Sequence, residues 1–353
     1  MTRAAILVEQ NWNTVPGGTA RATNNLIDAL HEHTDARVVG VHGLHRRAPG
    51  LELPSAMETA RVPFPGRVIA EAWSRGQGPS IDRWIDADVV HAPAYVLPKT
   101  KKPLVATIHD LAFVRHPEWF TPHGVRYFTR FLDRVRDTDT MVITPSQTTA
   151  NDCAARGIDR ANLRVIPWGI DVRIATDDDV VEVRQRYSLP EVFVLFVGTL
   201  EPRKNLTTLA EAMSKVSSAP LVVAGPTGWG DVDLPGSWML GEVPAADIEA
   251  LMAAATVLAY PSHFEGFGLP VLEAMAQGTP VVTTAETAPA EVAGGGGLTI
   301  DSHSVDELAD ALRSLIDSPE QRRTLGEAAK IRAADFRWDV TARATAKVYE
   351  EIS

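Results

Sequence analysis

The chain has 353 residues, of which 45% are hydrophobic and 22% charged, a composition typical of a globular protein with two domains. The 34 basic and 45 acidic residues give a net charge of -11, which argues against nucleic acid as the main partner because the phosphate backbone binds basic surfaces. Cys153 is the only cysteine, which excludes an internal disulfide and a cysteine-based zinc site.

The N-terminus carries only a short apolar segment. Ala4–Val8 is followed directly by Glu9, and five apolar residues are too few for a signal peptide or a membrane span. We therefore expect a cytoplasmic protein. A weak peripheral contact with the inner face of the membrane is left open, and the sequence does not predict the oligomeric state.

Short β-rich runs alternate with helical patterns along the whole chain, which predicts an α/β architecture with parallel sheets. The expected strands are Ala4–Val8, Val38–Val41, Asp88–His91, Leu104–Ile108, Met141–Thr144, Leu163–Ile166, Phe193–Val197, Leu221–Ala224, Val257–Tyr260 and Val281–Thr283. We interpret the two halves as doubly wound, Rossmann-like units facing across a cleft. Ligands of such units bind beyond the carboxyl ends of the strands.

A break in this pattern between residues 171 and 191 marks the expected domain boundary. The acidic run Asp177–Asp179 is interpreted as a solvated part of the linker. At the other end of the second half, Val340, Ala344, Val348 and Ile352 recur at helical spacing, which predicts a final amphipathic helix with its apolar side packed.

Two motifs of the first half follow expected strands. Gly17 and Gly18 stand between a strand and a helical pattern, where they permit close approach of a phosphate or sugar; a tight turn with Thr19 as helix N-cap is the favoured alternative. His109 directly follows the expected strand Leu104–Ile108. At the carboxyl end of that strand it could hydrogen-bond a sugar hydroxyl or a leaving group. A structural His, with Asp110 capping the next segment, is equally compatible with this position.

The segment 124–137 predicts an amphipathic helix. Arg126, Arg130 and Arg134 share its polar side and could face an anionic membrane. Because Asp133 and Asp137 interleave with them, a solvated and partly ion-paired face is the favoured interpretation.

Arg203 and Lys204 follow the expected strand Phe193–Val197 and precede a helical pattern for which Asn205 is a plausible N-cap. Arg can hold a phosphate through two hydrogen bonds and Lys adds a point charge. A solvated basic loop is the alternative. The glycine-rich stretches 225–230 and 294–297 are interpreted as turns.

The segment PSHFEGFGLPVLEAMAQGTPVVTT, residues 261–284, is the most informative. It predicts a helix over Leu269–Gln277 between two strands, with Pro270 in the first turn. Gly266 and Gly268 leave the backbone free to approach a ligand at the helix N-terminus, where an anion is favoured. Glu273 could accept hydrogen bonds from a sugar diol. The pattern therefore indicates a nucleotide or nucleotide-sugar site.

No metal site is predicted. The ten His residues are scattered and no HExxH spacing occurs. The only Asp-x-Asp considered, Asp177–Asp179, lies in the expected linker and not after a strand. We expect neither a metal nor another cofactor, and a nucleotide-diphosphate sugar as co-substrate.

Most of the chain resembles the retaining GT-B glycosyltransferases of family 4, also known as glycosyl transferases group 1. The second half carries this resemblance through FVGTLEPRKNLTTLAEAM and through the segment 261–284. The first half is looser, through PGGTARATNNLIDAL and ATIHDLAFVRHPEWF. The resemblance implies an acceptor-side domain over residues 1–172, a donor-binding domain over 173–335, and a closing helix over 336–353 that packs back on the first domain.

The resemblance also implies the site residues. The catalytic residues are expected to be His109 at the transferred sugar, Glu265 near the donor sugar, and Arg203 and Lys204 at the diphosphate, without a metal. The donor-binding residues are expected to be Gly17, Gly18, Arg203, Lys204, Ser262, Gly266, Phe267, Gly268, Leu269 and Glu273, with Glu273 at the ribose hydroxyls. Trp168 departs from the family, which often has Asn before Gly169.

The function implied is transfer of a hexose, with mannose from GDP-mannose as the best interpretation, to a hydroxyl of a glycan, a lipid-linked glycan or a small molecule. A UDP-sugar donor is the nearest alternative. An epimerase, a phosphorylase or a non-catalytic nucleotide-sugar-binding subunit would use the same fold. Retention through a front-face route or a covalent intermediate stays open.

Overall fold

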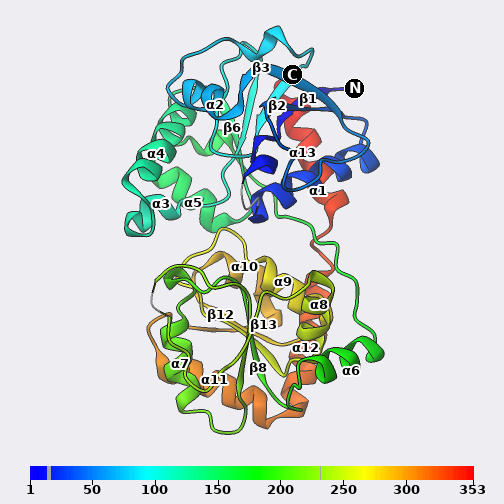
Figure 1. The fold of residues 1–353 in the computed structure, drawn as a ribbon, viewed down its shortest axis with the longest axis vertical. Helices are drawn as coiled ribbons and strands as arrows, with labels where there is room; N and C mark the ends of the chain where they lie inside the picture. The colour runs from blue at the N-terminus through cyan, green and yellow to red at the C-terminus, as the bar shows by residue number, and fades with distance from the viewer. Residues whose placement is uncertain (14–16, 231) are drawn as a thin grey trace. The chain divides into compact units, whose positions relative to one another are not determined.

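The structure is a computed structural model, described here over residues 1–13, 17–230 and 232–353. The chain divides into two compact units (Figure 1): residues Met1–Gly169 with Arg337–Ser353, and residues Ile170–Phe336. The sequence analysis placed these boundaries at residues 172 and 335. Each unit has its own sheet and its own core, and each is described by itself.

The first unit contains a seven-stranded parallel sheet in the order β3-β2-β1-β4-β5-β6-β7. Its strands are β1 (Arg3–Leu7), β2 (Arg37–Leu44), β3 (Glu58–Pro65), β4 (Val89–Ala92), β5 (Leu104–Thr107), β6 (Thr140–Thr144) and β7 (Leu163–Val165). Its helices are α1 (Gly17–His33), α2 (Gly66–Ser74), α3 (Ala112–Arg115), α4 (Pro122–Arg136), α5 (Gln147–Ala155) and α13 (Trp338–Ile352), with the 3-10 turns η1 (Glu9–Trp12), η2 (Ile81–Arg83), η3 (Pro117–Trp119) and η4 (Arg160–Asn162).

The second unit contains a six-stranded parallel sheet in the order β10-β9-β8-β11-β12-β13. Its strands are β8 (Val194–Val197), β9 (Leu221–Ala224), β10 (Trp238–Gly241), β11 (Val257–Tyr260), β12 (Val281–Thr284) and β13 (Gly297–Ile300). Its helices are α6 (Asp177–Arg186), α7 (Leu206–Ser214), α8 (Ala245–Ala254), α9 (Leu269–Gln277), α10 (Ala288–Ala293), α11 (Val305–Asp317) and α12 (Pro319–Ala333), with η5 (Pro202–Lys204) and η6 (Gly294–Gly296).

Both sheets reverse their strand order at one point. In the first unit the reversal lies between β1 and β4, and in the second between β8 and β11. Six strands are buried along their whole length: β4, β6, β8, β9, β11 and β12. This burial is expected where helices cover both faces of a parallel sheet. The crevice outside the carboxyl ends at such a reversal is where doubly wound sheets bind ligands.

All ten strands expected from the sequence are confirmed, with ends that differ by a few residues. Three strands were missed, and all three lie at sheet edges: β3, β10 and β13. Strand β3 contains Pro63 and is mostly exposed, and β10 is also mostly exposed. An edge strand keeps one side in solvent, so its apolar pattern is weak and it tolerates proline.

The interpretation of two other segments was correct only in part. Asp177 and Asp178 are exposed, as expected of a solvated run, but Asp177–Asp179 is the first turn of α6 and not a linker; Thr176 and Asp179 form a reciprocal capping box there. Acidic residues suit that position because the helix dipole favours negative charge there. The predicted final helix is confirmed as α13, and Val348 lies on its buried side as expected, but the predicted apolar stripe is wrong at Val340. Val340 is 51% exposed, and Ala342 and Ala346 belong to the buried side, which packs against α1.

The arginines of α4 are held by the first unit's own groups. Arg130 pairs with Glu71 of α2 at 3.3 Å, and Arg134 donates to the backbone carbonyls of Trp73 and Leu97. Only Arg126 of the three is exposed. The partly ion-paired interpretation of this face is therefore confirmed for Arg130.

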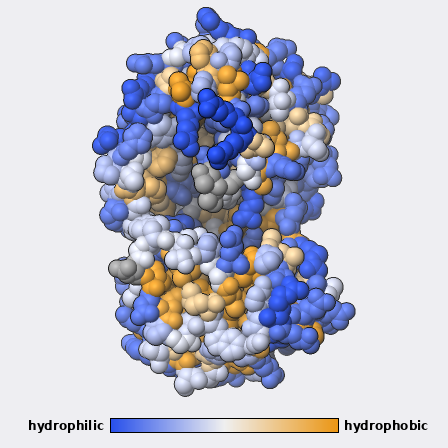
Figure 2. Space-filling view, viewed as in Figure 1, coloured by the Kyte–Doolittle hydropathy of each residue, from blue (hydrophilic) through white to orange (hydrophobic). Residues whose placement is uncertain are grey.

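Two observations concern the weak membrane contact that the sequence left open: the character of the helices and the distribution of apolar residues on the surface. Among the described residues, no helix has the length and apolar character needed to cross a membrane. On the face shown in Figure 2, apolar residues form scattered groups with hydrophilic residues between them.

A buried polar network joins α13 to the sheet of the first unit. The two ring nitrogens of His91 lie 2.7 Å from the hydroxyl of Tyr349 and 2.8 Å from Oγ1 of Thr107. Burial lowers the pKa of His91 to about 3, so the ring is neutral at ordinary pH. Both nitrogens have partners, which offsets the cost of burying a polar ring.

Replacing Tyr349 with Phe removes one partner of His91 and keeps the aromatic ring. We expect the free energy of unfolding to fall by about 1–3 kcal/mol, because a buried nitrogen loses its hydrogen bond. Urea denaturation measures this change. The control is Val340→Ala on the exposed side of the same helix, with an expected change below about 0.5 kcal/mol. Equal stability of Tyr349→Phe and wild type would contradict the proposed contribution of this network.

Candidate functional site

Two loops meet at the reversal of the second sheet. One follows β8 and includes η5, and the other connects β11 to α9. Because β8 and β11 are neighbours and parallel, their carboxyl ends lie at the same edge, and the two loops share that edge. The backbone N–H of His263 donates to the carbonyl of Arg203 at 2.9 Å, which joins the loops directly.

A compact charged cluster occupies this edge. Glu265 accepts from Nζ of Lys204 at 2.6 Å through one oxygen and from Arg203 at 2.5 Å through the other. Arg203 also pairs with Glu201 at 2.7 Å. The hydroxyl of Tyr260 lies 2.6 Å from Nζ of Lys204 and 3.1 Å from Glu265. The cluster therefore joins two carboxylates and two cations.

Burial distinguishes the two cations. The side chain of Lys204 is 7% exposed and that of Arg203 is 24% exposed. Burial lowers the pKa of Lys204, and the charge of Glu265 opposes this effect. Burial alone would raise the pKa of Glu265, but the charges of Lys204 and Arg203 outweigh it and hold that pKa at about 2. Glu265 is therefore a carboxylate at ordinary pH.

Asn205 connects the cluster to the rest of the unit. It adopts a left-handed conformation with φ of 56°, which Asn tolerates better than most residues. Its amide donates to the carbonyl of Pro261 at 3.1 Å and to that of Ser302 at 2.7 Å. Asn205 does precede α7, but its side chain caps no N–H of that helix. Asn205 is therefore confirmed as the N-cap residue of α7, but its side chain fixes the two loops instead of capping the helix.

The predicted helix Leu269–Gln277 is confirmed as α9, with Pro270 in its first turn. Gly268 precedes it with φ of 107°, and a Cβ there would lie 3.0 Å from Cγ of Pro289, so glycine suits this position. Gly266 is half-buried before the helix. Glu273 is half-buried within it, on the second turn.

Two other expected binding residues of this loop are buried. The hydroxyl of Ser262 has no hydrogen-bond partner among the described residues, and the residue is only 1% exposed. The ring of Phe267 is 6% exposed and packs edge-on against Phe336 at 5.8 Å. Phe267 can therefore offer a ligand its backbone but not the face of its ring.

The remaining expected residues belong to the first unit. Gly17 and Gly18 form the exposed first turn of α1, with open space where a Cβ would stand; Thr19 lies inside this helix and is not its N-cap. Residues 14–16, which precede them, lie outside the described residues. Nε2 of His109 donates to the carbonyl of Pro93 at 2.7 Å.

His109 is held in one orientation and one protonation state. Its ring lies 5.6 Å from that of Trp168, which in turn lies 6.0 Å from Trp338. Burial lowers the pKa of His109. With Nε2 protonated to donate to Pro93, Nδ1 of the neutral ring carries a lone pair and can accept a hydrogen bond. The side chain of Asp110 accepts the N–H of Ala112, the first residue of α3, as in the alternative of a structural His, although the N-cap residue of α3 is Leu111.

Sequence reasoning missed Tyr260. Its hydroxyl contacts both Lys204 and Glu265, and its ring lies 4.8 Å from Nζ of Lys204. Tyr260 was assigned only to a buried strand. The available signal was its place as the last residue of that strand, where a polar end can reach the carboxyl edge of the sheet.

Glu265→Gln tests whether the carboxylate supports the buried cations. It leaves Lys204 buried without its main counter-charge, so we expect a loss of about 3–5 kcal/mol in the free energy of unfolding. Urea denaturation at pH 7 measures it. Adding Lys204→Met should recover part of this loss, because the unpaired charge is then absent. The matched control is Asp306→Asn in the exposed Lys215–Asp306 pair, with an expected loss below about 1 kcal/mol.

The lowered pKa of Glu265 predicts that the effect of Glu265→Gln on the free energy of unfolding depends on pH. The pKa of Glu265 is lowered from 4.5 to about 2, so its stabilising contribution is complete above pH 4.5 and is lost as the pH falls toward about 2. The stability difference between wild type and Glu265→Gln should therefore shrink over that window. A difference that stays constant from pH 7 to pH 3 would contradict the assignment.

Comparisons with known proteins place this geometry in a family. Residues 182–332 match the family described as Glycosyl transferases group 1, and residues 16–173 match the one described as Glycosyltransferase Family 4. O-antigen chain mannosyltransferase B of Escherichia coli is 30% identical over 281 residues, which cover 74% of each protein. A D-inositol 3-phosphate glycosyltransferase of Corynebacterium jeikeium is 31% identical over 282 residues, covering 71% of this chain and 67% of that protein.

Solved structures show the same fold. Anabaena Alr3699/HepE in complex with UDP and glucose superimposes with a TM-score of 0.75 at 20% identity, covering 99% of this chain and 100% of that one. WaaG, a glycosyltransferase involved in lipopolysaccharide biosynthesis, gives a TM-score of 0.71 at 18% identity, covering 99% of each chain. The chain therefore belongs to the GT-B glycosyltransferases of family 4, the group 1 glycosyl transferases, and is an enzyme that transfers a sugar from a nucleotide sugar.

Proposed function

We propose that the enzyme is a retaining hexosyltransferase that moves mannose from GDP-mannose to a hydroxyl acceptor without using a metal ion. The observation that carries the donor site is the cluster of Arg203, Lys204 and Glu265 at the reversal of the second sheet. Mannose is supported by the names of two relatives. One is the Escherichia coli mannosyltransferase, and the other is an MMP alpha-(1->4)-mannosyltransferase of Mycolicibacterium hassiacum, 30% identical over 305 residues.

Arg203 and Lys204 are proposed to stabilise the leaving diphosphate. Negative charge grows on that group as the bond to the sugar breaks, and positive groups already in place lower the barrier. Arg203 is the more exposed of the two, so its guanidinium meets the phosphates first. Lys204 lies behind it and adds its charge from a buried position. Glu265 orients both cations beside the donor sugar.

The start of α9 is proposed to hold the rest of the donor. The backbone N–H groups of residues 266–269 and the helix dipole favour the sugar and diphosphate at this end. Glu273 is proposed to accept hydrogen bonds from the ribose hydroxyls, and the buried hydroxyl of Ser262 adds a further polar contact. Because these groups recognise ribose and phosphate rather than the base, a UDP-sugar is the alternative donor.

We propose two substrate-binding roles for residues of the first unit. Gly17 and Gly18 are proposed to approach the diphosphate, since no side chain blocks their backbone. His109 is proposed to accept a hydrogen bond from a hydroxyl of the transferred sugar at Nδ1, the nitrogen that Pro93 does not engage. The acceptor is a glycan, a lipid-linked glycan or a small molecule with a free hydroxyl.

The test is a donor screen followed by identification of the product. GDP-mannose, UDP-glucose and other nucleotide sugars are incubated with an acceptor panel, and the product is measured by mass spectrometry and its anomeric configuration by NMR. We expect a mannosyl product with the α configuration of the donor. Transfer from a UDP-sugar alone would overturn the mannosyl assignment, and an inverted product would overturn retention.

Single substitutions test the residue roles. Lys204→Ala should lower kcat by about 10²–10³-fold, as the loss of one transition-state donor does in other enzymes. Glu273→Ala should mainly raise the KM for the donor. Lys215→Ala, in an exposed ion pair, is the matched control and should leave turnover unchanged. Full activity in both site variants would refute the donor-site assignment.

A further inference from the structure

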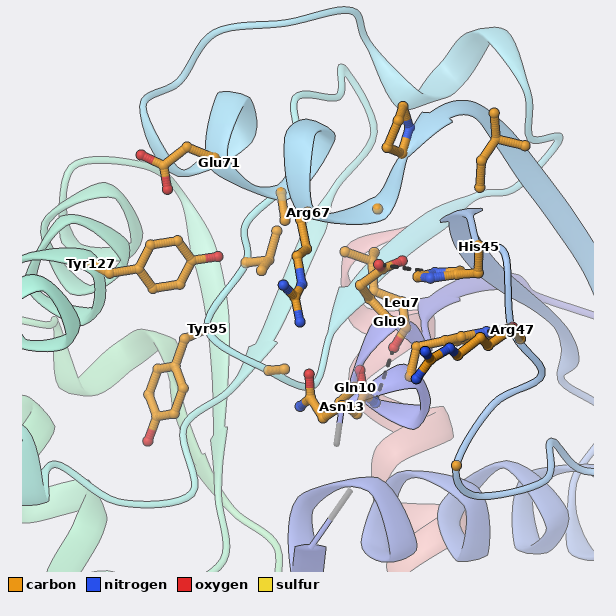
Figure 3. A pocket seen from close by; sticks show the side chains of 18 of the residues that line it. Leu7, Glu9, Gln10, Asn13, His45, Arg47, Arg67, Glu71, Tyr95 and Tyr127 are labelled. Atoms are coloured by element: carbon orange, nitrogen blue, oxygen red, sulfur yellow. Dashed lines mark hydrogen bonds and ion pairs between the residues drawn. The ribbon is translucent and has the colours of Figure 1, made fainter. Parts of the chain in front are cut away.

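The first unit contains a cavity of about 1190 Å³. It lies at the reversal between β1 and β4, and its lining comes from the segments that follow β1, β2, β3 and β4, together with part of α4 (Figure 3). This is the edge of a doubly wound sheet where ligands bind. The volume suits a small molecule with one or two rings.

Three arginines line this cavity: Arg46 and Arg47 after β2, and Arg67 in the first turn of α2. Among the described residues, none of their guanidinium groups forms an ion pair or a hydrogen bond with another side chain. In Figure 3, Arg67 extends toward the middle of the cavity, between Tyr127 and Glu9. Arg47 lies on the side of the cavity opposite Tyr127.

The acidic residues of the cavity are already engaged. Glu9 accepts the backbone N–H of Gly43 at 2.9 Å and pairs with His45 at 3.0 Å. Glu71 pairs with Arg75 at 2.8 Å and with Arg130 at 3.3 Å. Neither carboxylate is paired with Arg46, Arg47 or Arg67. The three arginines are exposed and outnumber the two carboxylates of the described lining, so the cavity carries an excess of positive charge in a chain whose net charge is -11.

The other walls suit a polar ring. Burial raises the pKa of Tyr127 to about 12, so its hydroxyl stays protonated and can donate; Figure 3 shows it directed into the cavity. Trp12 stacks on both His42 and His45, with ring centroids 4.7 and 4.3 Å away, and the two histidine rings lie 6.1 Å from each other. Aromatic side chains with polar ends bind rings that carry hydroxyls.

We propose that this cavity binds an acceptor that carries a phosphate group, with Arg46, Arg47 and Arg67 as the phosphate contacts. Arginine is suited to this because its planar guanidinium gives two parallel hydrogen bonds to phosphate oxygens. The inference rests on the proposed function, since it specifies the acceptor of that reaction. The shared chemistry is a phosphate ester on a hydroxylated ring, from either a soluble sugar phosphate or a lipid-linked diphosphate sugar.

The first experiment measures binding without transfer. With GDP at saturation to fill the donor site, calorimetry compares glucose 6-phosphate and myo-inositol 1-phosphate with glucose and myo-inositol. We expect a phosphorylated probe to bind at least about tenfold more tightly than its neutral partner, because charge-assisted hydrogen bonds are the stronger kind. A short-chain prenyl-diphosphate sugar, tested beside them, distinguishes a lipid-linked source from a soluble one.

Variants assign the effect to the arginines. Arg67→Gln and the double variant Arg46→Gln/Arg47→Gln should each weaken the phosphorylated probe by about tenfold or more and leave the neutral probe unaffected. Arg67→Lys should retain part of the affinity. Arg126→Gln, which removes an exposed arginine outside the cavity lining, is the matched control. Thermal unfolding checks that each variant is folded.

The second experiment measures transfer to the same acceptors with the donor that proves active. A lower KM for the phosphorylated acceptors, lost in Arg67→Gln, supports the inference. If all phosphorylated probes bind and react no better than neutral ones, or if a uronic acid is preferred, the inference is wrong while the proposed function stands. If the phosphorylated probes bind through the arginines but no donor and acceptor pair gives transfer, the proposed function fails instead.

Discussion

The buried pairing of Glu265 with Lys204 and Arg203 is the interaction on which the proposed donor site depends. A lysine as buried as Lys204 needs a carboxylate beside it, because an uncompensated charge is costly in the interior. Glu265 meets that need with one oxygen and accepts from Arg203 with the other, and the hydroxyl of Tyr260 contacts both Lys204 and Glu265. The loops after β8 and β11 are thereby held in one arrangement, with the cations placed before substrate arrives. Such preorganisation is what electrostatic catalysis requires.

Both units have a parallel sheet whose strand order reverses at one point, but the charged residues at the two reversals differ in their pairing. In the second unit, the cations at the reversal of the sheet are paired and their geometry is fixed. In the first unit, the arginines at the corresponding edge have no acidic partner within the described ranges 1–13, 17–230 and 232–353, while Glu9 and Glu71 contact other groups. A fixed cluster suits a group whose charge changes during the reaction. Unpaired arginines suit a ligand that brings its own constant negative charge.

The sequence predicted the parallel sheets and α9 because buried strands and a helix bounded by Gly268 and Gly278 have strong local patterns. The sequence also indicated that Arg203, Lys204 and Glu265 lie at the same edge of the sheet, because each of them follows an expected strand. Local patterns predicted the edge strand β7 but not β3 and β10, whose exposed sides carry little apolar signal, nor β13. They also did not predict the role of Tyr260 or Asn205, since both act through contacts about 56 residues away in the chain. Such contacts follow from strand order, which one sequence does not fix.

If Arg203 and Lys204 recognise the diphosphate of the donor, the enzyme must distinguish ligands that differ by one phosphate. Calorimetric titration of GDP and GMP into the wild type and into Lys204→Met measures this discrimination. We expect the wild type to bind GDP at least about tenfold more tightly than GMP, and Lys204→Met to lose most of this preference. Equal affinity of the wild type for GDP and GMP, or an unchanged preference in the variant, would contradict that recognition.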